Sequence, residues 1–323
     1  MSVAGTRVQR TAWVLSNGLV GMDNQSTGLA EALELDYTVK HLVPVAPWKY
    51  LPPNLWYSPL TQLGEGSDAL VAPWPDVVIG TGRLNVAASI AIRRASGGRT
   101  VNIRIQHPRV NLTHFDVVVA PQHDRCKGRH VIETLGAVNR MTHAHLNDAV
   151  QRFSHRYSHL PRPYITLLMG GNNSQYVLDQ AFAERLSKKL SHALQDSGGS
   201  LLMTPSRRTD PAAVQVLREN LSDYPVEIWD GTGENPYFSY LGLADYVVVT
   251  ADSVNMASEA CYTGKPVFIE GLTGQNTKFE RFHRSLQRQG YTQSFTGALS
   301  SWQYTPLDET SRAAQQIKHV LGW

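Results

Sequence analysis

Apolar runs of strand length alternate with helical segments along the first half of the chain. Runs typical of buried strands cover residues 12–15, 37–42, 76–80, 100–106 and 115–120, and helical patterns cover 24–35 and 86–94. Strands that alternate with helices predict βαβ units and a parallel sheet. In such a sheet, the loops that follow the strands are the usual place for a ligand.

The same alternation restarts in the second half. Strand-type runs cover residues 164–169, 200–204, 226–229, 246–250 and 266–270, and helical patterns cover 179–195, 211–220 and 255–263. The chain therefore consists of two βαβ-rich halves of similar length, which predicts an α/β protein of two Rossmann-like domains.

A polar stretch with two prolines separates the halves, which indicates an interdomain linker. We place the first domain at residues 1–155, the linker at 156–164 and the second domain at 165–305. Residues 306–323 then form a terminal segment with a helix over 309–320.

Composition excludes several classes of protein. The chain has 323 residues, of which 42% are hydrophobic and 18% charged, and this suits a folded, soluble protein. A net charge of +3 is too weak to indicate nucleic-acid binding. The two cysteines, Cys126 and Cys261, are far apart, which excludes a disulfide scaffold and favours a reducing compartment. Because no apolar run has the length of a membrane span or a signal-peptide core, we expect a cytoplasmic protein.

Common metal and nucleotide motifs are absent from the sequence. No two aspartates are spaced as Asp-x-Asp, the usual metal clamp for a nucleotide-sugar. Gly264-Lys265 is followed by Pro266, so there is no Walker A loop, and Gly80-Thr-Gly82 does not continue as a dinucleotide fingerprint. We therefore expect neither a bound metal ion nor a cofactor.

Polar and glycine-rich loops follow two strands of the second half. Gly170-Gly171-Asn172 follows the strand at 164–169, where glycines and backbone amides would let an anion approach. The alternative is a tight turn without a ligand. Ser206, Arg207 and Arg208 follow the next strand, and two guanidiniums there could neutralise a diphosphate without a metal; a solvated arginine pair is the alternative.

The richest polar stretch surrounds the strand at 246–250. Asp252 or Ser253 is placed to cap the helix that follows, and Glu259 lies about two turns further along it. A carboxylate there could accept hydrogen bonds from both ribose hydroxyls, whereas the alternative is a surface glutamate on an amphipathic helix. The candidate donor-binding set is Gly170, Gly171, Asn172, Ser206, Arg207, Glu234, Asn235, Thr250, Asp252, Ser253, Met256 and Glu259.

The order of these loops resembles the C-terminal half of two-domain GT-B glycosyltransferases, such as the lipid-linked N-acetylglucosaminyltransferase of peptidoglycan synthesis. The whole chain resembles the "elongated mitochondria" family, which is named for plant mitochondrial-fission factors and is widespread in bacteria. Matching segments run almost from end to end, at residues 21–25, 75–83, 105–109, 115–124, 233–238, 250–253, 278–283 and 304–307. The resemblance implies a GT-B-like fold, with two domains facing across a cleft and a C-terminal helix crossing back to the first domain.

In a GT-B arrangement the first domain would bind the acceptor. The loop after its first strand commonly supplies the catalytic base in inverting enzymes, and Asp23 is the only acid in that loop. A role of Asp23 as a helix cap is the alternative. His107 is the second candidate base, with a structural role at the Pro108 turn as its alternative. Further acceptor-side candidates are Gln25, Arg83, His123 and Asp124.

Two further clusters of side chains stand out. Residues 44–57 are rich in Trp, Tyr and Pro, which suits peripheral contact with a membrane or a lipid-linked acceptor; a packed irregular loop is the alternative. A second cluster consists of four histidines, His143, His145, His155 and His159. We interpret them as part of a solvated linker rather than as a zinc site, because no Cys or carboxylate completes a ligand set.

We therefore expect a metal-independent glycosyltransferase. Its partners would be a nucleotide-sugar donor and a cell-envelope glycan or lipid-linked acceptor, at the inner face of the membrane. The alternative, which follows from the plant relatives, is a non-catalytic adaptor that recruits a dynamin-like GTPase to a membrane. An adaptor would be free to lose the donor-binding residues, whereas this sequence keeps all of them.

Overall fold

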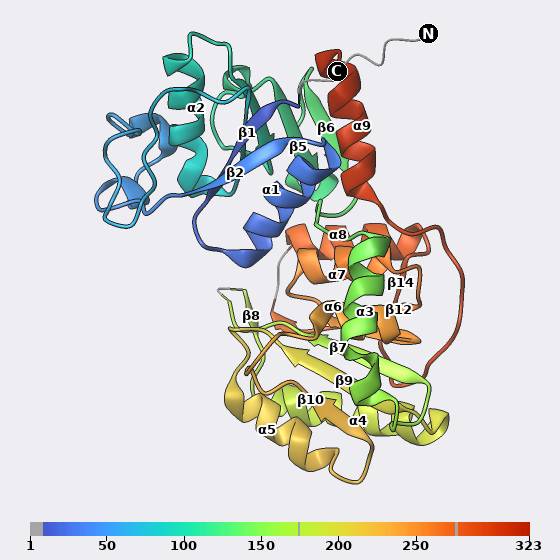
Figure 1. The fold of residues 1–323 in the computed structure, drawn as a ribbon. Helices are drawn as coiled ribbons and strands as arrows, with labels where there is room; N and C mark the ends of the chain where they lie inside the picture. The colour runs from blue at the N-terminus through green and yellow to red at the C-terminus, as the bar shows by residue number, and fades with distance from the viewer. Residues whose placement is uncertain (1–8, 174, 275–276) are drawn as a thin grey trace, which may run out of the picture. The chain divides into compact units, whose positions relative to one another are not determined.

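The computed structural model describes residues 9–173, 175–274 and 277–323 (Figure 1). The chain forms two compact units. The first runs up to Arg140 and includes Asp308–Trp323, and the second is Met141–Leu307.

The first unit is built on a six-stranded sheet of order β2-β1-β3-β4-β5-β6, in which every pairing is parallel. Successive side chains of a strand face opposite sides of the sheet. Val14 and Ile103 pack under α1 and α9, whereas Leu15 and Val78 pack on the side of α2. The elements are β1 (Thr11–Ser16), α1 (Val20–Ala32), β2 (Asp36–His41), β3 (Val77–Thr81), α2 (Val86–Ala95), β4 (Val101–Ile105), β5 (Val117–Pro121), β6 (Val131–Thr134) and α9 (Glu309–Leu321).

Short 3-10 helices lie in the loops of the first unit. They are η1 (Trp48–Tyr50), η2 (Pro53–Leu55), η3 (Arg83–Asn85), η4 (Leu112–His114) and η5 (Gln122–Asp124). Three of them, η1, η2 and η3, follow β2 and β3, and η5 follows β5, so they lie in loops at the carboxyl ends of strands.

The C-terminal helix α9 returns to the first unit, as the GT-B resemblance implies. Ala313 and Ile317 are 0% exposed and pack in the same cluster as Leu29 of α1. Thr310 Oγ1 accepts a hydrogen bond from the Asn139 amide and donates one to the Asn139 carbonyl, each at 2.8 Å. Apolar packing and paired polar groups together fix α9 on this unit.

The second unit contains another parallel six-stranded sheet, of order β10-β9-β7-β11-β12-β14. Helices α4 and α5 share one apolar cluster with the sheet, and α3 and α6 share another on the opposite face. The sheet strands are β7 (Tyr164–Met169), β9 (Ser200–Pro205), β10 (Val226–Ile228), β11 (Tyr246–Thr250), β12 (Val267–Glu270) and β14 (Thr292–Ser294), and β8 (Tyr176–Val177) pairs with β13 (Thr273–Gly274). The helices are α3 (His143–Tyr157), α4 (Gln180–Ser197), α5 (Pro211–Asn220), α6 (Tyr237–Leu243), α7 (Val254–Tyr262) and α8 (Thr277–Arg288).

The division between the units falls ahead of the expected linker. Residues 143–157 form helix α3, and Phe153 and Tyr157 of this helix pack against Tyr240 of α6. Only residues 155–157 of the polar stretch that indicated a linker lie in this helix, and the rest connects α3 to β7. The segment expected at 156–164 consequently lies inside the second unit.

Candidate functional site

The carboxyl ends of β7 and β11 lie side by side, because these two strands pair in the second sheet. The Gly170 amide donates to Thr250 Oγ1 at 2.8 Å, and the Gly171 amide donates to Asp252 Oδ2 at 3.0 Å. Thr250 Oγ1 in turn donates to Asp252 Oδ1 at 2.6 Å. Asp252 therefore locks the two strand-end loops together.

The glycines after β7 are required by this close approach. A Cβ atom on Gly170 would lie 2.1 Å from Asp252 Oδ2, and one on Gly171 would lie 2.2 Å from the carbonyl carbon of Arg208. Asp252 is 4% exposed, and its burial raises the pKa of the carboxyl group, against the hydrogen bonds from Thr250 and Gly171. The arrangement fits the tight-turn alternative, since both glycine amides donate within the protein.

The helix predicted at 179–195 is α4, and it does not follow the glycines directly. Asn172 and Asn173 lead into β8, and α4 begins at Gln180 with Asp179 as its cap, whose side chain accepts a hydrogen bond from the Phe182 amide. The glycine turn therefore does not lie at a helix N-terminus. Asn172 Oδ1 instead accepts a hydrogen bond from the Leu178 amide at 2.6 Å, which holds the loop in shape.

The β9–α5 loop joins the same edge of the sheet. The Ser206 amide donates to the Met169 carbonyl at 2.9 Å, which fixes the end of β9 to the end of β7. Of the two arginines, Arg208 is the one that approaches Asp252, with 3.9 Å between Nη2 and Oδ2. Arg207 is exposed on the same loop. The sequence indicated the arginine pair but did not single out Arg208.

Glu259 is buried, so the surface-glutamate alternative is wrong. Its side chain lies on α7, whose N-terminus is capped by Ser253 through a 3.2 Å hydrogen bond from the Met256 amide. Glu259 is 7% exposed, and Tyr237 Oη donates to its Oε2 at 2.5 Å. Burial raises the pKa of Glu259 to about 7, although the Tyr237 hydrogen bond opposes the shift. A carboxyl group with this pKa changes charge near neutral pH.

The 231–237 loop reaches Glu259 through Tyr237. Asn235 Oδ1 accepts a hydrogen bond from the Tyr237 amide at 3.0 Å and shapes the turn before α6. Glu234 is exposed and forms an ion pair with Arg152 of α3. The structure thus connects Asn235 to Glu259 by way of Tyr237 and directs Glu234 to α3.

His283 is a site residue to which sequence reasoning gave no role. It lies on α8, and its Nε2 is 2.8 Å from the Ala251 carbonyl oxygen, next to Asp252. The side chain is 8% exposed, and burial lowers its pKa. A neutral imidazole that donates from Nε2 holds the β11–α7 loop in place. The sequence offered one indication of a role for His283, because this residue lies in the segment 278–283 that resembles the family.

In the first unit, the candidate acceptor-side residues gather at the carboxyl ends of β4 and β5. The His107 amide donates to Asp124 Oδ2 at 3.4 Å, and Gln106 Nε2 donates to Gln25 Oε1 at 3.3 Å. His123 and Asp124 lie in η5, and both side chains are almost fully buried. His107 is exposed, and its Nδ1 accepts a hydrogen bond from the Arg109 amide at 2.9 Å.

Asp23 lies in the first turn of α1, not in the preceding loop. Helix α1 begins at Val20, and its N-cap is Leu19, which makes no side-chain capping bond. The capping alternative for Asp23 is therefore wrong. A carboxylate in a first helical turn is stabilised by the positive end of the helix dipole. Asp23 is half-buried in this position.

Arg83, which lies between β3 and α2, is hydrogen-bonded to the aromatic segment at residues 44–57. Its Nη1 donates to the Leu51 carbonyl at 3.0 Å, and its Nη2 donates to the Lys49 carbonyl. Tyr50 and Tyr57 are each 73% exposed. Arg83 thus holds a segment that presents aromatic side chains to the surroundings. Across the described ranges, no helix has the length and apolar character needed to cross a membrane.

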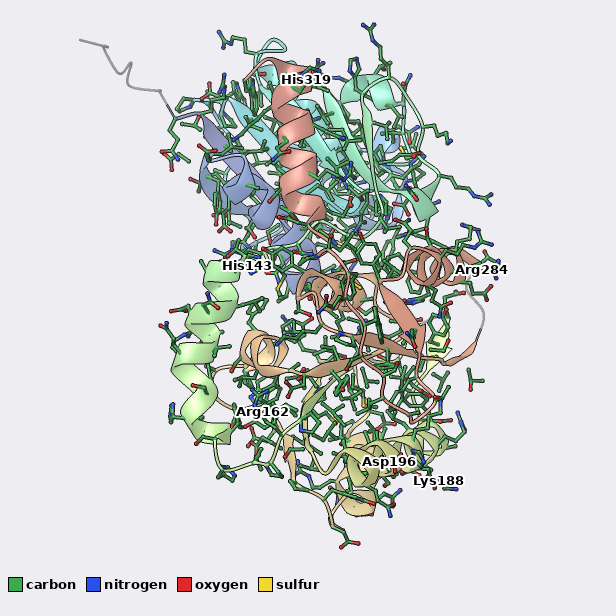
Figure 2. All side chains as sticks on the ribbon, turned by 90° about the vertical axis from the view of Figure 1, so that its right-hand side faces the viewer. His143, Arg162, Lys188, Asp196, Arg284 and His319 are labelled. Atoms are coloured by element: carbon green, nitrogen blue, oxygen red, sulfur yellow. The ribbon has the colours of Figure 1, made fainter. Side chains whose placement is uncertain are left out.

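The four histidines near residue 150 do not form one cluster. His143 begins α3 and His155 lies in its last turn, and Figure 2 shows His143 and Arg162 near opposite ends of that helix. Twelve residues of α-helix separate the two histidines by about 18 Å. In the part of the chain that the structure describes, no group of three or more His, Cys, Asp or Glu side chains could hold a metal ion.

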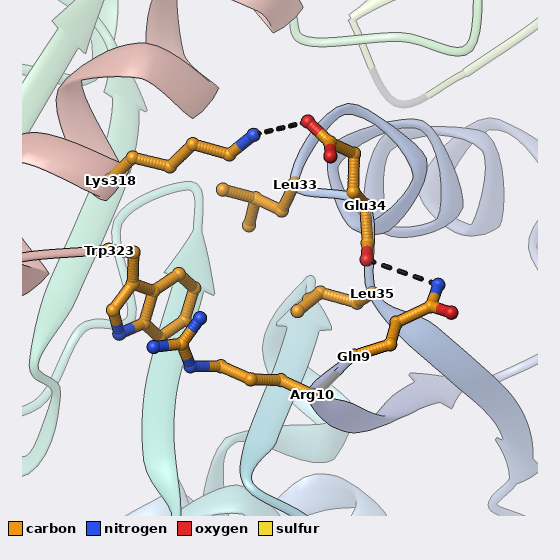
Figure 3. Close-up of a pocket in the computed structure, with 7 residues that line it drawn as sticks. All are labelled: Gln9, Arg10, Leu33, Glu34, Leu35, Lys318 and Trp323. Atoms are coloured by element: carbon orange, nitrogen blue, oxygen red, sulfur yellow. Dashed lines mark hydrogen bonds and ion pairs between the residues drawn. The ribbon is translucent and has the colours of Figure 1, made fainter. Parts of the chain in front are cut away.

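A cavity of about 300 Å³ lies in the first unit, at the amino ends of β1 and β2 (Figure 3). Lys318 Nζ is 2.6 Å from Glu34 Oε1, and the Arg10 guanidinium lies 4.4 Å from the centre of the Trp323 ring. This is the sheet edge opposite to the loops described above. The cavity therefore belongs to the packing between α1, α9 and β1 rather than to the candidate site.

Similar proteins were found by sequence and by structure. The family described as "Mitochondrial fission ELM1" matches residues 20–321. The chain is 33% identical to the mitochondrial fission protein ELM1 of Arabidopsis thaliana over 279 residues, which cover 77% of this chain and 65% of the plant protein. A protein of Rickettsia prowazekii is 26% identical, over 96% of this chain and 98% of its own.

Solved structures resemble the whole chain at low sequence identity. The UDP-GlcNAc 2-epimerase of Methanocaldococcus jannaschii has a TM-score of 0.57 at 11% identity, and covers 96% of this chain and 99% of its own. The glycotransferase of kitacinnamycin has a TM-score of 0.53 at 12% identity, and the match covers 97% of this chain and 99% of that protein. MurG of Acinetobacter baumannii has a TM-score of 0.50 at 14% identity, and the match covers 97% of this chain and 90% of that protein. The fold is therefore GT-B-like, and the chain belongs to the Mitochondrial fission ELM1 family.

Proposed function

We propose that this protein is a metal-independent glycosyltransferase that binds a nucleotide-activated sugar in its second unit. The observation that carries the proposal is the convergence of the β7, β9 and β11 loops on Asp252, just before α7, the helix that also carries the buried carboxyl group of Glu259. Structural neighbours support it, since one acts on UDP-GlcNAc and another is a glycotransferase by name.

The donor would lie along the N-terminus of α7. Its diphosphate would accept hydrogen bonds from the first amides of this helix, where the dipole favours an anion. Arg207 and Arg208 would supply the positive charge that a metal supplies elsewhere, because guanidinium forks pair well with phosphate. The ionised Glu259 would accept hydrogen bonds from the ribose hydroxyls, with Tyr237 holding the carboxylate in place.

The side chains favour Asp23 over His107 as the catalytic base. His107 Nδ1 already accepts a hydrogen bond from the Arg109 amide. In a neutral imidazole, the other nitrogen then carries the proton and cannot accept one. Asp23 has a carboxylate in a first helical turn and requires no change of tautomer. His107 would instead stabilise the turn at Pro108.

Binding of nucleotides tests the proposal directly. Calorimetric titration of UDP, GDP and UDP-sugars, with magnesium and then with EDTA, should show one nucleotide that binds equally well in both conditions. Glu259→Ala should weaken that binding by about 1–3 kcal/mol, because charged hydrogen bonds to the ribose are lost. Glu184→Ala is the matched control, since Glu184 is an exposed carboxylate on α4. If no nucleotide binds, the enzyme proposal is refuted.

A second candidate function is adaptor activity in membrane fission, which the family membership favours. In this case the chain would bind a dynamin-like GTPase and would not turn over a sugar nucleotide. Co-purification with a dynamin-like GTPase, together with an absence of nucleotide binding in the calorimeter, would decide for the adaptor. Nucleotide binding that depends on Glu259 would decide against it.

We further propose that the 44–57 segment contacts a membrane surface. Exposed fractions of 73% for Tyr50, 57% for Leu55 and 73% for Tyr57 support this role, because amphipathic aromatic side chains favour the membrane interface. Co-sedimentation with anionic lipid vesicles should fall when Leu55 and Tyr57 are replaced by serine. Val320→Ser, which alters an exposed apolar residue on α9, is the control. Equal sedimentation of both variants would refute the contact.

A further inference from the structure

Positive charge is concentrated in residues 93–130 of the first unit. This stretch contains eight Arg or Lys residues and only two Asp residues, although the whole chain has a net charge of +3. The remainder of the chain therefore contains more acidic than basic residues. Such an asymmetry of charge, rather than the net charge of a chain, indicates where an anionic partner binds.

The eight cations of this stretch differ in their surroundings. Arg93 forms an ion pair with Asp116 at 2.8 Å, and Arg104 is buried and hydrogen-bonded to Asn85. The second acid, Asp124, has a side chain that is only 6% exposed. Within residues 9–173, 175–274 and 277–323, the exposed cations of this stretch that form no ion pair are Arg94, Arg99, Arg109, Arg125, Lys127 and Arg129.

Two of these arginines lie at the carboxyl edge of the first sheet. Arg109 follows β4 and Arg125 follows β5, and these two strands pair in parallel. The His107 amide donates to Asp124 Oδ2 at 3.4 Å, which joins the two loops. Both arginines have a left-handed backbone, with φ of +56° and +53°. Non-glycine residues in this conformation are uncommon and cluster at functional sites.

The loops that carry these arginines continue over the α2 side of the sheet. Val110 and Cys126, which adjoin the two arginines, pack in one cluster with α2. A Cβ atom on Gly128 would lie 3.2 Å from Leu112 Cδ1, so the β4–β5 and β5–β6 loops lie side by side. The two cations that flank Gly128 therefore belong to the same part of the first unit as Arg109.

Arg94 extends this region along α2, where it lies in the last turn of the helix. Burial lowers the pKa of His114 in the β4–β5 loop, and the charges of Arg94 and Arg93 lower it further. The positive charges of the helix and the loop therefore reinforce one another. We call the following exposed residues the basic surface: Arg94, Arg109, Arg125, Lys127 and Arg129.

The aromatic segment at 44–57 lies on the other flank of α2. Val86 and Ile90 pack with the β4–β5 loop, whereas Ala88 and Ile92 pack with the chain that follows β2. Helical residues two positions apart point in nearly opposite directions. The short helix η2 of the aromatic segment contacts α2, beside which Figure 1 draws these loops in blue. Helix α2 thus separates exposed aromatic side chains from the basic surface.

A lipid surface fits this combination better than a nucleic acid does. Aromatic side chains favour the membrane interface, and guanidinium groups pair with the phosphates of lipid headgroups. Leu55 is 57% exposed and Val71 is 63% exposed. Aliphatic side chains of this kind are removed from water by a lipid surface but not by a phosphate backbone.

We propose that the basic surface binds the anionic headgroups of a lipid membrane while the 44–57 segment contacts the same membrane. This role rests on the membrane contact proposed for that segment, and it adds the class of lipid and the residues that select it. Juxtaposed basic side chains are attracted to anionic lipids within a Debye length of the surface, so the contact should weaken in salt.

Co-sedimentation with two kinds of vesicle tests the proposal, one of phosphatidylcholine alone and one that also contains phosphatidylglycerol. The wild type should bind the anionic vesicles more tightly. Arg109→Asn together with Arg125→Asn should weaken this binding by about 10–30-fold, since each cation near an anionic surface contributes about fivefold. Asparagine is chosen because it tolerates the left-handed backbone. Arg185→Gln together with Lys188→Gln removes the same charge from exposed positions of α4 and should leave binding unchanged.

The outcomes separate the basic surface from the aromatic contact. Equal binding of the wild type to both kinds of vesicle would overturn the basic surface and leave the aromatic contact alone. Binding that is lost in the arginine variant but kept in Leu55→Ser/Tyr57→Ser would support the basic surface and refute the aromatic contact. Binding of duplex DNA by the wild type, without binding of anionic vesicles, would replace the membrane by a nucleic acid.

A second variant keeps the test decisive if the asparagine variant does not fold. Lys127→Gln together with Arg129→Gln changes two exposed positions at which neither residue has a positive φ. This variant should also weaken binding to the anionic vesicles by about 10–30-fold. Wild-type affinity of a folded Lys127→Gln/Arg129→Gln protein for these vesicles would overturn the proposal.

Discussion

Replacement of Glu259 by glutamine should change how the stability of the protein depends on pH. Burial raises the pKa of Glu259 from 4.5 to about 7. The unfolded chain releases this proton near pH 4.5, whereas the folded chain holds it up to about pH 7. Between these values the folded state binds more protons than the unfolded state, so stability falls as the pH rises.

The size of the effect follows from the pKa difference. Each pKa unit corresponds to about 1.4 kcal/mol, so the free energy of unfolding should fall by about 3 kcal/mol between pH 4.5 and pH 7.5 through this residue alone. Glutamine cannot ionise but keeps an oxygen that can accept the Tyr237 hydrogen bond. Glu259→Gln should therefore match the wild type near pH 5 and exceed its stability by a few kcal/mol at pH 8.

Urea unfolding across pH 5 to 8 measures this difference. Subtracting the wild-type curve from the Glu259→Gln curve removes the contribution of the histidines, which both proteins share. Glu184→Gln alters an exposed glutamate of the same unit and should follow the wild type throughout. Parallel curves for wild type and Glu259→Gln would show that Glu259 titrates normally, and the burial argument would then be wrong.

The remaining predictions concern packing, docking and catalysis. Gly170→Ala should destabilise the protein by about 1–3 kcal/mol in urea unfolding, because its Cβ would meet a buried carboxylate oxygen at 2.1 Å, whereas Gly271→Ala, with open space around it, should be neutral. Thr310→Ala should lose about 1–3 kcal/mol, since it removes two buried hydrogen bonds to the Asn139 backbone, and Thr310→Ser should recover most of this; an unchanged midpoint for the alanine variant would contradict the docking of α9. Asp23→Asn should reduce turnover of a sugar nucleotide by about 10²–10⁴-fold with unchanged nucleotide affinity, and full activity would exclude Asp23 as the base.

Strand positions and the ligand-binding edges could be predicted from the sequence because they depend on local pattern. Apolar runs of strand length followed by glycine or polar residues indicated β3, β7 and β11 correctly, with small shifts at the ends. The Ser253 cap was predictable for the same reason, since capping requires only a suitable residue before a helical pattern. Helix α3 was missed because its apolar residues are few and widely spaced among polar ones.

The sequence by itself therefore determined the family, the two βαβ-rich halves and the loops that carry polar groups, because each depends on residue types over short stretches. Only the tertiary structure decided which groups meet. Tyr237 and Glu259 are 22 residues apart and Asn85 and Arg104 are 19 apart, yet each pair shares a hydrogen bond. Burial and the partners of a side chain depend on packing between distant segments, and these set the pKa of Glu259 and the unpaired charge of Arg104.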